Sequence, residues 1–282
     1  MQRFRIFHET TYRYSNPVVL GPHKLLVRPR DGHDVRIEAS KLNITPNAIV
    51  SWHRDELDNS VALVTFDQSP TTALTITSEV TVAHYLSSRE HLPLNDHVEC
   101  FPFGYTEVEQ ILLSAYLSDD FQDPIFDQWI NDLAVSKNNT VALLHDLSAA
   151  IYGQCTYQAR DEEGVQNPAE TIVKNVGSCR DYAWLYVVAT RKLGFAARFV
   201  SGYFHTAGTA LADGSTHAWA EVYLPGAGWT GFDPTCNRMT AENHIPVSVA
   251  VNPEDIPPVS GHFIGPVEEN PSLLVRVNVN PC

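Results

Sequence analysis

Residues 177–181 read Gly177-Ser178-Cys179-Arg180-Asp181, and an apolar run with helical periodicity follows them as far as Leu193. A turn of small residues ahead of such a run predicts that a helix begins at the cysteine. The backbone N–H groups at a helix start carry partial positive charge, and positive charge stabilises the thiolate, which is the nucleophilic form of cysteine. The pattern therefore predicts a reactive thiol at Cys179.

A histidine and an aspartate follow Cys179 in the order of a catalytic triad. His217 lies in the stretch 216–219, and Asp233 lies in the stretch 231–235. In a Cys-His-Asp triad the histidine acts as general base, and the aspartate holds its ring in the working tautomer. His217 and Trp219 alternate along a predicted strand and would share one face, where the indole would shield the site from water.

Other polar residues beside these motifs are candidates for supporting roles. The backbone N–H of Cys179 is one predicted oxyanion donor. Tyr157 and Gln154 are candidates for the second, because they precede the nucleophile on a strand-like run. Asp181 and Arg180 are expected to form an ion pair or loop contacts at the helix start rather than to take part in the chemistry.

The remaining histidines and cysteines have no such sequence context. A lone histidine on an apolar strand is usually a core or surface residue, and a free cysteine usually packs as a small hydrophobic side chain. These interpretations apply to His205, His244, His262, Cys100, Cys155, Cys236 and Cys282. Five widely spaced cysteines with no C-x-x-C pair indicate neither a disulfide framework nor a zinc site. We therefore predict no metal and no cofactor.

The composition limits the class of protein and its partners. The chain has 282 residues, of which 44% are hydrophobic and 18% charged, as in a globular protein long enough for two domains. Its 33 acidic and 19 basic residues give a formal net charge of −14, which opposes binding to nucleic acid. No segment has the roughly 18 consecutive apolar residues of a membrane helix, and residues 1–9 lack the apolar core of a secretion signal. We expect a cytoplasmic protein with no nucleic-acid or membrane partner.

The first part of the chain has the pattern of an antiparallel β domain. Between residues 4 and 84, short alternating runs are separated by turn residues such as Asn16-Pro17 and Asp58-Asn59. This spacing is typical of a β-sandwich or small barrel. We assign residues 1–85 to this domain and residues 86–104, which contain Pro93 and Pro102, to a linker or covering loop.

The second part of the chain changes to helical periodicity and then to strands. A capping-type residue at Thr106, a proline at the first helical position in Asp123-Pro124, and helical periodicity from Asn139 predict three helices. Strand-like runs follow the Cys179 helix, with a last strand at 273–279. Helices followed by strands indicate an α+β domain. We assign residues 105–282 to it, with a catalytic core at about 140–236.

Five segments carry a resemblance to a known family: 164–171, 177–185, 193–203, 216–225 and 228–235. At these residues the chain resembles the transglutaminase-like superfamily of papain-type thiol enzymes, in particular its bacterial two-domain branch. Residues 11–18 resemble the N-terminal β domain of that branch. The resemblance implies an α+β fold with a papain-like, transglutaminase-type core behind a sandwich-like β domain. It also implies that Cys179 is the nucleophile, His217 the base and Asp233 the orienting acid.

Three functions agree with this pattern. The first is a thiol hydrolase, such as a cysteine protease, that cleaves peptide or isopeptide amide bonds through a thioacyl intermediate on Cys179. The second is an amine-dependent protein-glutamine acyl transferase, which shares every step up to that intermediate. The third is a binding or scaffolding module with a vestigial site. We favour hydrolysis of a peptide or protein substrate, because no accessory region for presenting two proteins is evident. The sequence leaves the oligomeric state open.

Overall fold

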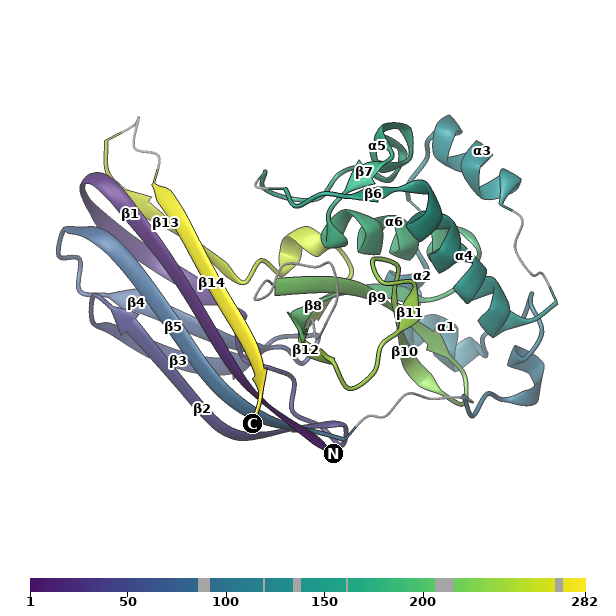
Figure 1. The fold of residues 1–282 in the computed structure, drawn as a ribbon, viewed down its shortest axis with the longest axis horizontal. Helices are drawn as coiled ribbons and strands as arrows, with labels where there is room; N and C mark the ends of the chain where they lie inside the picture. The colour runs from purple at the N-terminus through teal and green to yellow at the C-terminus, as the bar shows by residue number, and fades with distance from the viewer. Residues whose placement is uncertain (86–91, 119, 134–137, 161, 206–215, 267–270) are drawn as a thin grey trace.

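The computed structural model describes residues 1–282 except 86–91, 119, 134–137, 161, 206–215 and 267–270. A large antiparallel sheet forms one side of the molecule, and a smaller sheet with helices forms the other (Figure 1). No helix in the described ranges is both long enough and apolar enough to cross a membrane.

The large sheet is organised around one long first strand. In spatial order its strands are β2 (Val35–Thr45), β5 (Thr71–His84), β1 (Gln2–Leu25), β4 (Ser60–Phe66) and β3 (Ala48–Arg54). The first half of β1 pairs with β5, and its last residues pair with β4. An N-terminal β domain is therefore present, with β1 shared between its two halves.

Strand β1 is longer than the short runs that the sequence predicts. Asn16-Pro17 was expected to end a strand, but β1 continues through it. The pairing register with β5 shifts between Arg13 and Val18, so Pro17, which has no N–H to donate, lies at an irregularity where the regular ladder is interrupted. The proline bends the strand rather than ending it.

The end of the chain returns to the N-terminal sheet. Strand β13 (Val259–Ile264) pairs with the last part of β1, and β14 (Ser272–Pro281) pairs with the first part, with Val279 opposite Ile6. The last strand was expected at 273–279 and is present, but the boundary at 105–282 grouped it with the catalytic part, and the hydrogen bonding contradicts that grouping. An alternating strand carries no local signal of its partner, and the open edge of β1 needs one.

The helices begin where the capping residues indicate. Thr106 and Glu109 form a capping box, Asp123 accepts the N–H of Ile125, and Asn139 accepts the N–H of Ala142. The helical and short elements are η1 (Asp96–Val98), α1 (Glu107–Leu112), α2 (Ser114–Leu117), α3 (Pro124–Asp132), α4 (Thr140–Gln154), β6 (Thr156–Tyr157), α5 (Pro168–Lys174), β7 (Val176–Gly177), α6 (Cys179–Lys192) and η2 (Pro253–Asp255).

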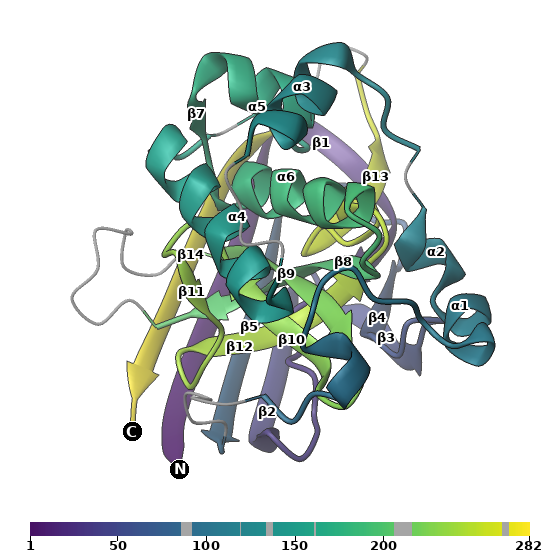
Figure 2. The same cartoon turned by 90° about the vertical axis from the view of Figure 1, so that its right-hand side faces the viewer.

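The smaller sheet lies between the helices and the large sheet. Its order is β11 (Arg238–Met239), β10 (Gly228–Asp233), β9 (Thr216–Leu224), β8 (Ala197–Phe204) and β12 (His244–Ala250). Helices α4 and α6 lie across one face of it, as Figure 2 shows. Alternate residues of β8 and β12 on the opposite face, including Tyr203 and Ile245, pack against Phe4 and Ile6 of the large sheet. The two sheets therefore share a buried apolar interface.

Candidate active site

Helix α6 begins at Cys179, which is half-buried. Its start is held by Asp181, whose Oδ2 accepts the backbone N–H of Ser178 at 2.7 Å and its hydroxyl at 2.8 Å. The negative charge of an acid in the first turn also interacts favourably with the positive end of the helix dipole. The local sequence thus fixes both the start of the helix and the place of the cysteine.

The carboxylate of Asp181 is fully buried and is a structural anion. Its Oδ1 accepts the N–H of Gln166 at 2.7 Å and Nη1 of Arg160 at 2.6 Å. Burial alone would raise the pKa of Asp181, but the N–H groups of Gln166 and Ser178 and the Arg160 guanidinium outweigh it and lower the pKa. The expected ion pair at the helix start is therefore made with Arg160, while Arg180 donates to the backbone carbonyls of Arg160 and Glu162.

His217 and Asp233 form a buried pair on adjacent strands of the small sheet. Nε2 of His217 lies 2.8 Å from Oδ2 of Asp233. Cys179 lies close enough to the His217 ring to influence its pKa, and because Asp233 occupies Nε2, Nδ1 is the ring nitrogen left for the thiol. Burial would lower the pKa of His217, but the charge of Asp233, its hydrogen bond and Cys179 together raise it to about 10. The ring is therefore an imidazolium at neutral pH.

Asp233 is held as a carboxylate by three donors. Its Oδ1 accepts the N–H of Thr235 at 2.9 Å, and its Oδ2 accepts from His217 and from Nε2 of His244, the latter at 3.1 Å. Burial would raise the pKa of Asp233, but the His217 charge and the hydrogen bonds from both imidazoles lower it strongly. The acid stays ionised although it has no solvent exposure.

His244 is a site residue that the sequence did not indicate. It is buried, as expected of a core histidine, but its ring also contacts Asp233 directly. No spacing or motif marks it, because β12 follows β11 in the chain but pairs with β8, at the opposite side of the sheet. Only the fold brings it to the aspartate.

Trp219 lies beside the histidine pair on the expected face of β9. Its ring centroid is 6.2 Å from that of His217 and 5.3 Å from that of His244, and the side chain is buried. Its six-membered ring reaches Gly202 of β8, where a Cβ would lie 2.6 Å from it. The indole thus closes off the side of His217 that faces the large sheet.

The two oxyanion candidates differ in their surroundings. Both amide hydrogens of Gln154 are engaged, by Asn175 Oδ1 at 3.0 Å and Ile172 O at 3.4 Å, so this side chain has no donor left for an oxyanion. Tyr157 is 38% exposed. Burial is the main cause that raises the pKa of Tyr157 to about 12. Its hydroxyl is therefore a protonated donor within electrostatic reach of the thiol.

A second cysteine lies next to the triad. Burial, with the charge of Asp233, raises the pKa of the Cys236 thiol to about 12, so this thiol is neutral. The ligand-type atoms of His217, Asp233 and Cys236 lie within 4.8 Å of one another. Because both oxygens of Asp233 already accept N–H bonds, the arrangement is that of a hydrogen-bonded network rather than a set of open metal ligands.

The thiol opens into a cleft of about 500 Å³. Cys179 and His217 line it together with residues of β8 and β9. Its rim is formed by residues 163–165 on one side and by η2 with the following prolines on the other. The cleft connects the thiol to solvent.

A cysteine at a helix start, facing a histidine and an aspartate on adjacent strands, defines the core of the papain-like thiol fold. Residues 127–234 match the transglutaminase-like superfamily, and residues 4–83 match the bacterial transglutaminase-like N-terminal region. Together these matches span about two thirds of the sequence. The chain belongs to the transglutaminase-like superfamily, in the branch with an N-terminal β domain.

Similar proteins extend over nearly the whole chain. A protein of Mycobacterium tuberculosis, described as uncharacterized, is 29% identical over 300 residues, covering 99% of this chain and 93% of its own. One from Mycobacterium leprae, also described as uncharacterized, is 24% identical over 289 residues, covering 98% and 99%. The solved structure of a candidate cysteine protease from Cytophaga hutchinsonii superposes with a TM-score of 0.74 at 19% identity, covering 99% of this chain and 90% of that one. The predicted α+β fold with its N-terminal β domain is confirmed.

Proposed function

We propose that this chain is a thiol hydrolase that cleaves peptide or isopeptide amide bonds through a thioacyl intermediate on Cys179. The observation that supports this most is the pairing of His217 with Asp233 at 2.8 Å, with the other ring nitrogen facing the thiol at the start of α6. Nucleophile, proton carrier and orienting acid are then in hydrogen-bond sequence.

The reaction follows from these positions. The Cys179 thiolate attacks the scissile carbonyl carbon, and the oxyanion that forms accepts the backbone N–H of Cys179 and the Tyr157 hydroxyl. The His217 imidazolium gives its Nδ1 proton to the leaving amine, and the C–N bond breaks. Water, deprotonated by the now neutral His217, attacks the thioester, and the carboxylate leaves as Cys179 is released.

Hydrolysis is proposed over amine transfer because of the surroundings of the cleft. The described residues form the large sheet, the small sheet with its helices, and the short helices within 107–132, and none of these makes a further domain over the cleft. The cleft therefore opens to solvent. Water can therefore reach the thioester without a second bound protein. We extend the proposal to a cytoplasmic location, which fractionation of cells that produce the protein would test.

The test uses a peptide library in H₂¹⁸O, with and without a primary alkylamine, read by mass. We expect cleaved products whose new carboxylate carries one ¹⁸O, produced by the wild type and absent with Cys179→Ala. Cys100→Ala, which removes an exposed thiol, is the matched control and should behave as wild type. Amine adducts without cleavage or deamidation would overturn the hydrolase assignment.

A further inference from the structure

We propose that His244 is a positioning residue, which holds the Asp233 carboxylate for His217 and is itself held in place by the N-terminal sheet through His84. This inference rests on the proposed function, because it concerns the same triad. Four residues are linked in order from the large sheet towards the thiol: His84, His244, Asp233 and His217. The first link goes to the backbone oxygen of His244, and the other two join side chains.

The hydrogen bonds of His244 define its tautomer. The backbone N–H of Ala241 points at Nδ1 from 3.3 Å, so Nδ1 accepts and carries no proton. A neutral imidazole then has its proton on Nε2, which lies 3.1 Å from Oδ2 of Asp233 and donates to it. His244 therefore adds a donor to the carboxylate without adding a charge that would compete with the His217 imidazolium.

The packing around His244 leaves its ring one orientation. The side chain is almost fully buried, with Phe204 at 4.6 Å and Trp219 at 5.3 Å between ring centroids. The charged groups that face it are Asp233 from β10, His217 from β9 and Arg238 from β11. Burial, the largest effect, lowers the pKa of His244 despite the Asp233 carboxylate, which agrees with a neutral ring.

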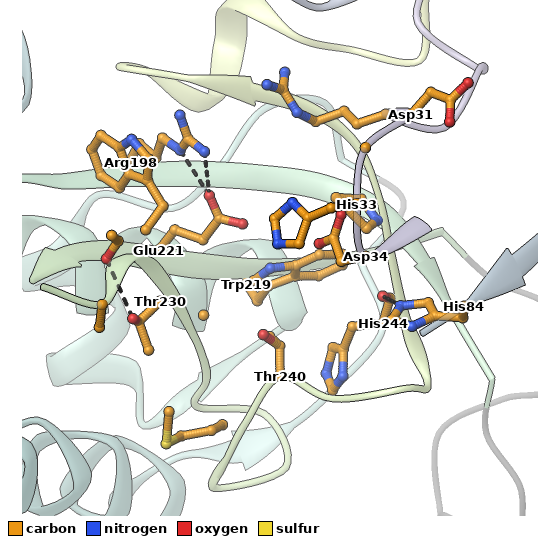
Figure 3. Close-up of a pocket in the computed structure, with 18 residues that line it drawn as sticks. Asp31, His33, Asp34, His84, Arg198, Trp219, Glu221, Thr230, Thr240 and His244 are labelled. Atoms are coloured by element: carbon orange, nitrogen blue, oxygen red, sulfur yellow. Dashed lines mark hydrogen bonds and ion pairs between the residues drawn. The ribbon is translucent and has the colours of Figure 1, made fainter. Parts of the chain in front are cut away.

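The N-terminal sheet contacts this residue directly. His84, the last residue of β5, is buried, and its Nε2 donates to the backbone oxygen of His244 at 2.9 Å. Both histidines line a cavity of about 410 Å³ between the 30–34 loop and the small sheet, in which Figure 3 shows His84 beside His244. The large sheet thus holds the start of β12 at His244, whose side chain contacts Asp233.

Without His244, Oδ2 of Asp233 would keep a single donor. The N–H of Thr235 holds Oδ1 but leaves the carboxylate free to turn about that contact. A second N–H on Oδ2 fixes the plane of the carboxylate and therefore the plane of the imidazole it orients. The expected role is alignment, with no contact to substrate.

The test compares two replacements of His244. If hydrogen bonding matters, one of them should disturb Cys179 more, and if only packing matters, the other should. His244→Gln keeps an N–H for Asp233 and an oxygen for Ala241, whereas His244→Phe keeps the aromatic packing and loses both. The readout is the rate of Cys179 alkylation by iodoacetamide at pH 7, followed on the Cys179 peptide by mass, together with the thermal midpoint. This readout needs no substrate.

We expect alkylation to fall about tenfold in His244→Phe, the loss of one hydrogen bond to a charged group, and to stay within about threefold of wild type in His244→Gln. A packing role alone predicts the reverse order, and that order, or equal rates, would overturn the inference. His8→Phe is the matched control, since His8 is equally buried but bonds the Tyr203 hydroxyl instead of the triad.

A measurement on the wild type covers the case in which a variant does not fold. Long-range ¹H–¹⁵N spectra of the histidine rings should assign to His244 the neutral tautomer with the proton on Nε2. An Nδ1–H tautomer or a protonated ring would contradict the inference. If wild-type Cys179 itself reacts as an ordinary thiol, the proposed function fails; if it is reactive and His244→Phe matches it, only the inference fails.

Discussion

Asp181 and Arg160 form an ion pair, with 2.6 Å between Oδ1 and Nη1, and Asp181 lies two residues after Cys179 in the first turn of α6. The aspartate has no solvent exposure and the guanidinium is 14% exposed. Asp181 therefore joins Arg160 and Gln166, the latter directly after rim residues 163–165, to the first turn of α6.

Removing this carboxylate should destabilise the fold and displace Cys179. Asp181→Ala leaves two backbone N–H groups without their acceptor and leaves Arg160 with only the exposed Glu162 as a partner, so we expect a loss of about 3–5 kcal/mol in the free energy of unfolding by urea. Glu170→Ala is the control, because Glu170 pairs with Lys174 at the surface, where such a pair contributes at most about 0.5 kcal/mol. Equal losses in the two variants would contradict the structural role of Asp181.

Asp233→Asn should lower turnover strongly while the protein remains folded. The amide has one acceptor oxygen where the carboxylate has two, so it cannot keep His217, His244 and Thr235 all satisfied. We expect peptide hydrolysis to fall by about 10²–10⁴-fold, as when a triad histidine is held in the wrong tautomer. Circular dichroism checks the fold, and near-wild-type hydrolysis would mean that another group orients His217.

The same substitution should change how stability depends on pH. The folded pKa of His217 is raised to about 10 from its ordinary 6.5, so its contribution is full below pH 6.5 and is lost as the pH rises toward 10. The pKa of Asp233 is lowered, so its contribution is present above about pH 4 and is lost on acidification. These are two sides of one interaction. Urea unfolding should therefore separate wild type from Asp233→Asn most at pH 5–6.5 and least near pH 10.

Tyr157→Phe tests the second oxyanion donor. Losing the hydroxyl should lower kcat by about 10²-fold with little change in KM, because an oxyanion donor acts on the transition state rather than on bound substrate. Tyr152→Phe, at an exposed position on α4, should leave both constants unchanged. An equal change in KM and none in kcat would instead assign Tyr157 to substrate binding.

Gly202 gives a test of the packing behind the site. A Cβ there would lie 2.4 Å from the backbone oxygen of Ile245 and 2.6 Å from the Trp219 ring, neither of which can move away easily. Gly202→Ala should therefore cost about 1–3 kcal/mol of stability and slow Cys179 alkylation, since Trp219 packs on His217. Gly104→Ala, where a Cβ meets nothing within 4 Å, is the control and should change neither.

Local rules explain which parts of this molecule were predictable from sequence. The helix starts at Thr106, Asp123 and Asn139 follow from side chains that cap the backbone a few residues on. The sequence likewise predicts a triad order for Cys179, His217 and Asp233, because each lies in a distinctive short motif, and their catalytic roles stay a prediction. The geometry places His217 against Asp233 and turns its other ring nitrogen to the thiol.

What could not be predicted depends on contacts between distant segments. Arg160 rather than Arg180 pairs with Asp181, because the chain folds back over the helix start. His244 reaches Asp233 through the strand order of the small sheet, which no spacing encodes. The division into residues 1–85, 86–104 and 105–282 remains a prediction for the domains as units, but the pairing of β14 with β1 crosses it.

The pairing of β1 with β14 also delays completion of the large sheet during biosynthesis. Residues 4–13 are synthesised well before residues 272–281, the strand that hydrogen-bonds them. Until then the emerging chain exposes a long, unpaired strand edge, a form that invites association with other nascent chains. Because β1 can complete its pairing only after β14 has been synthesised, we expect slow, chaperone-assisted folding.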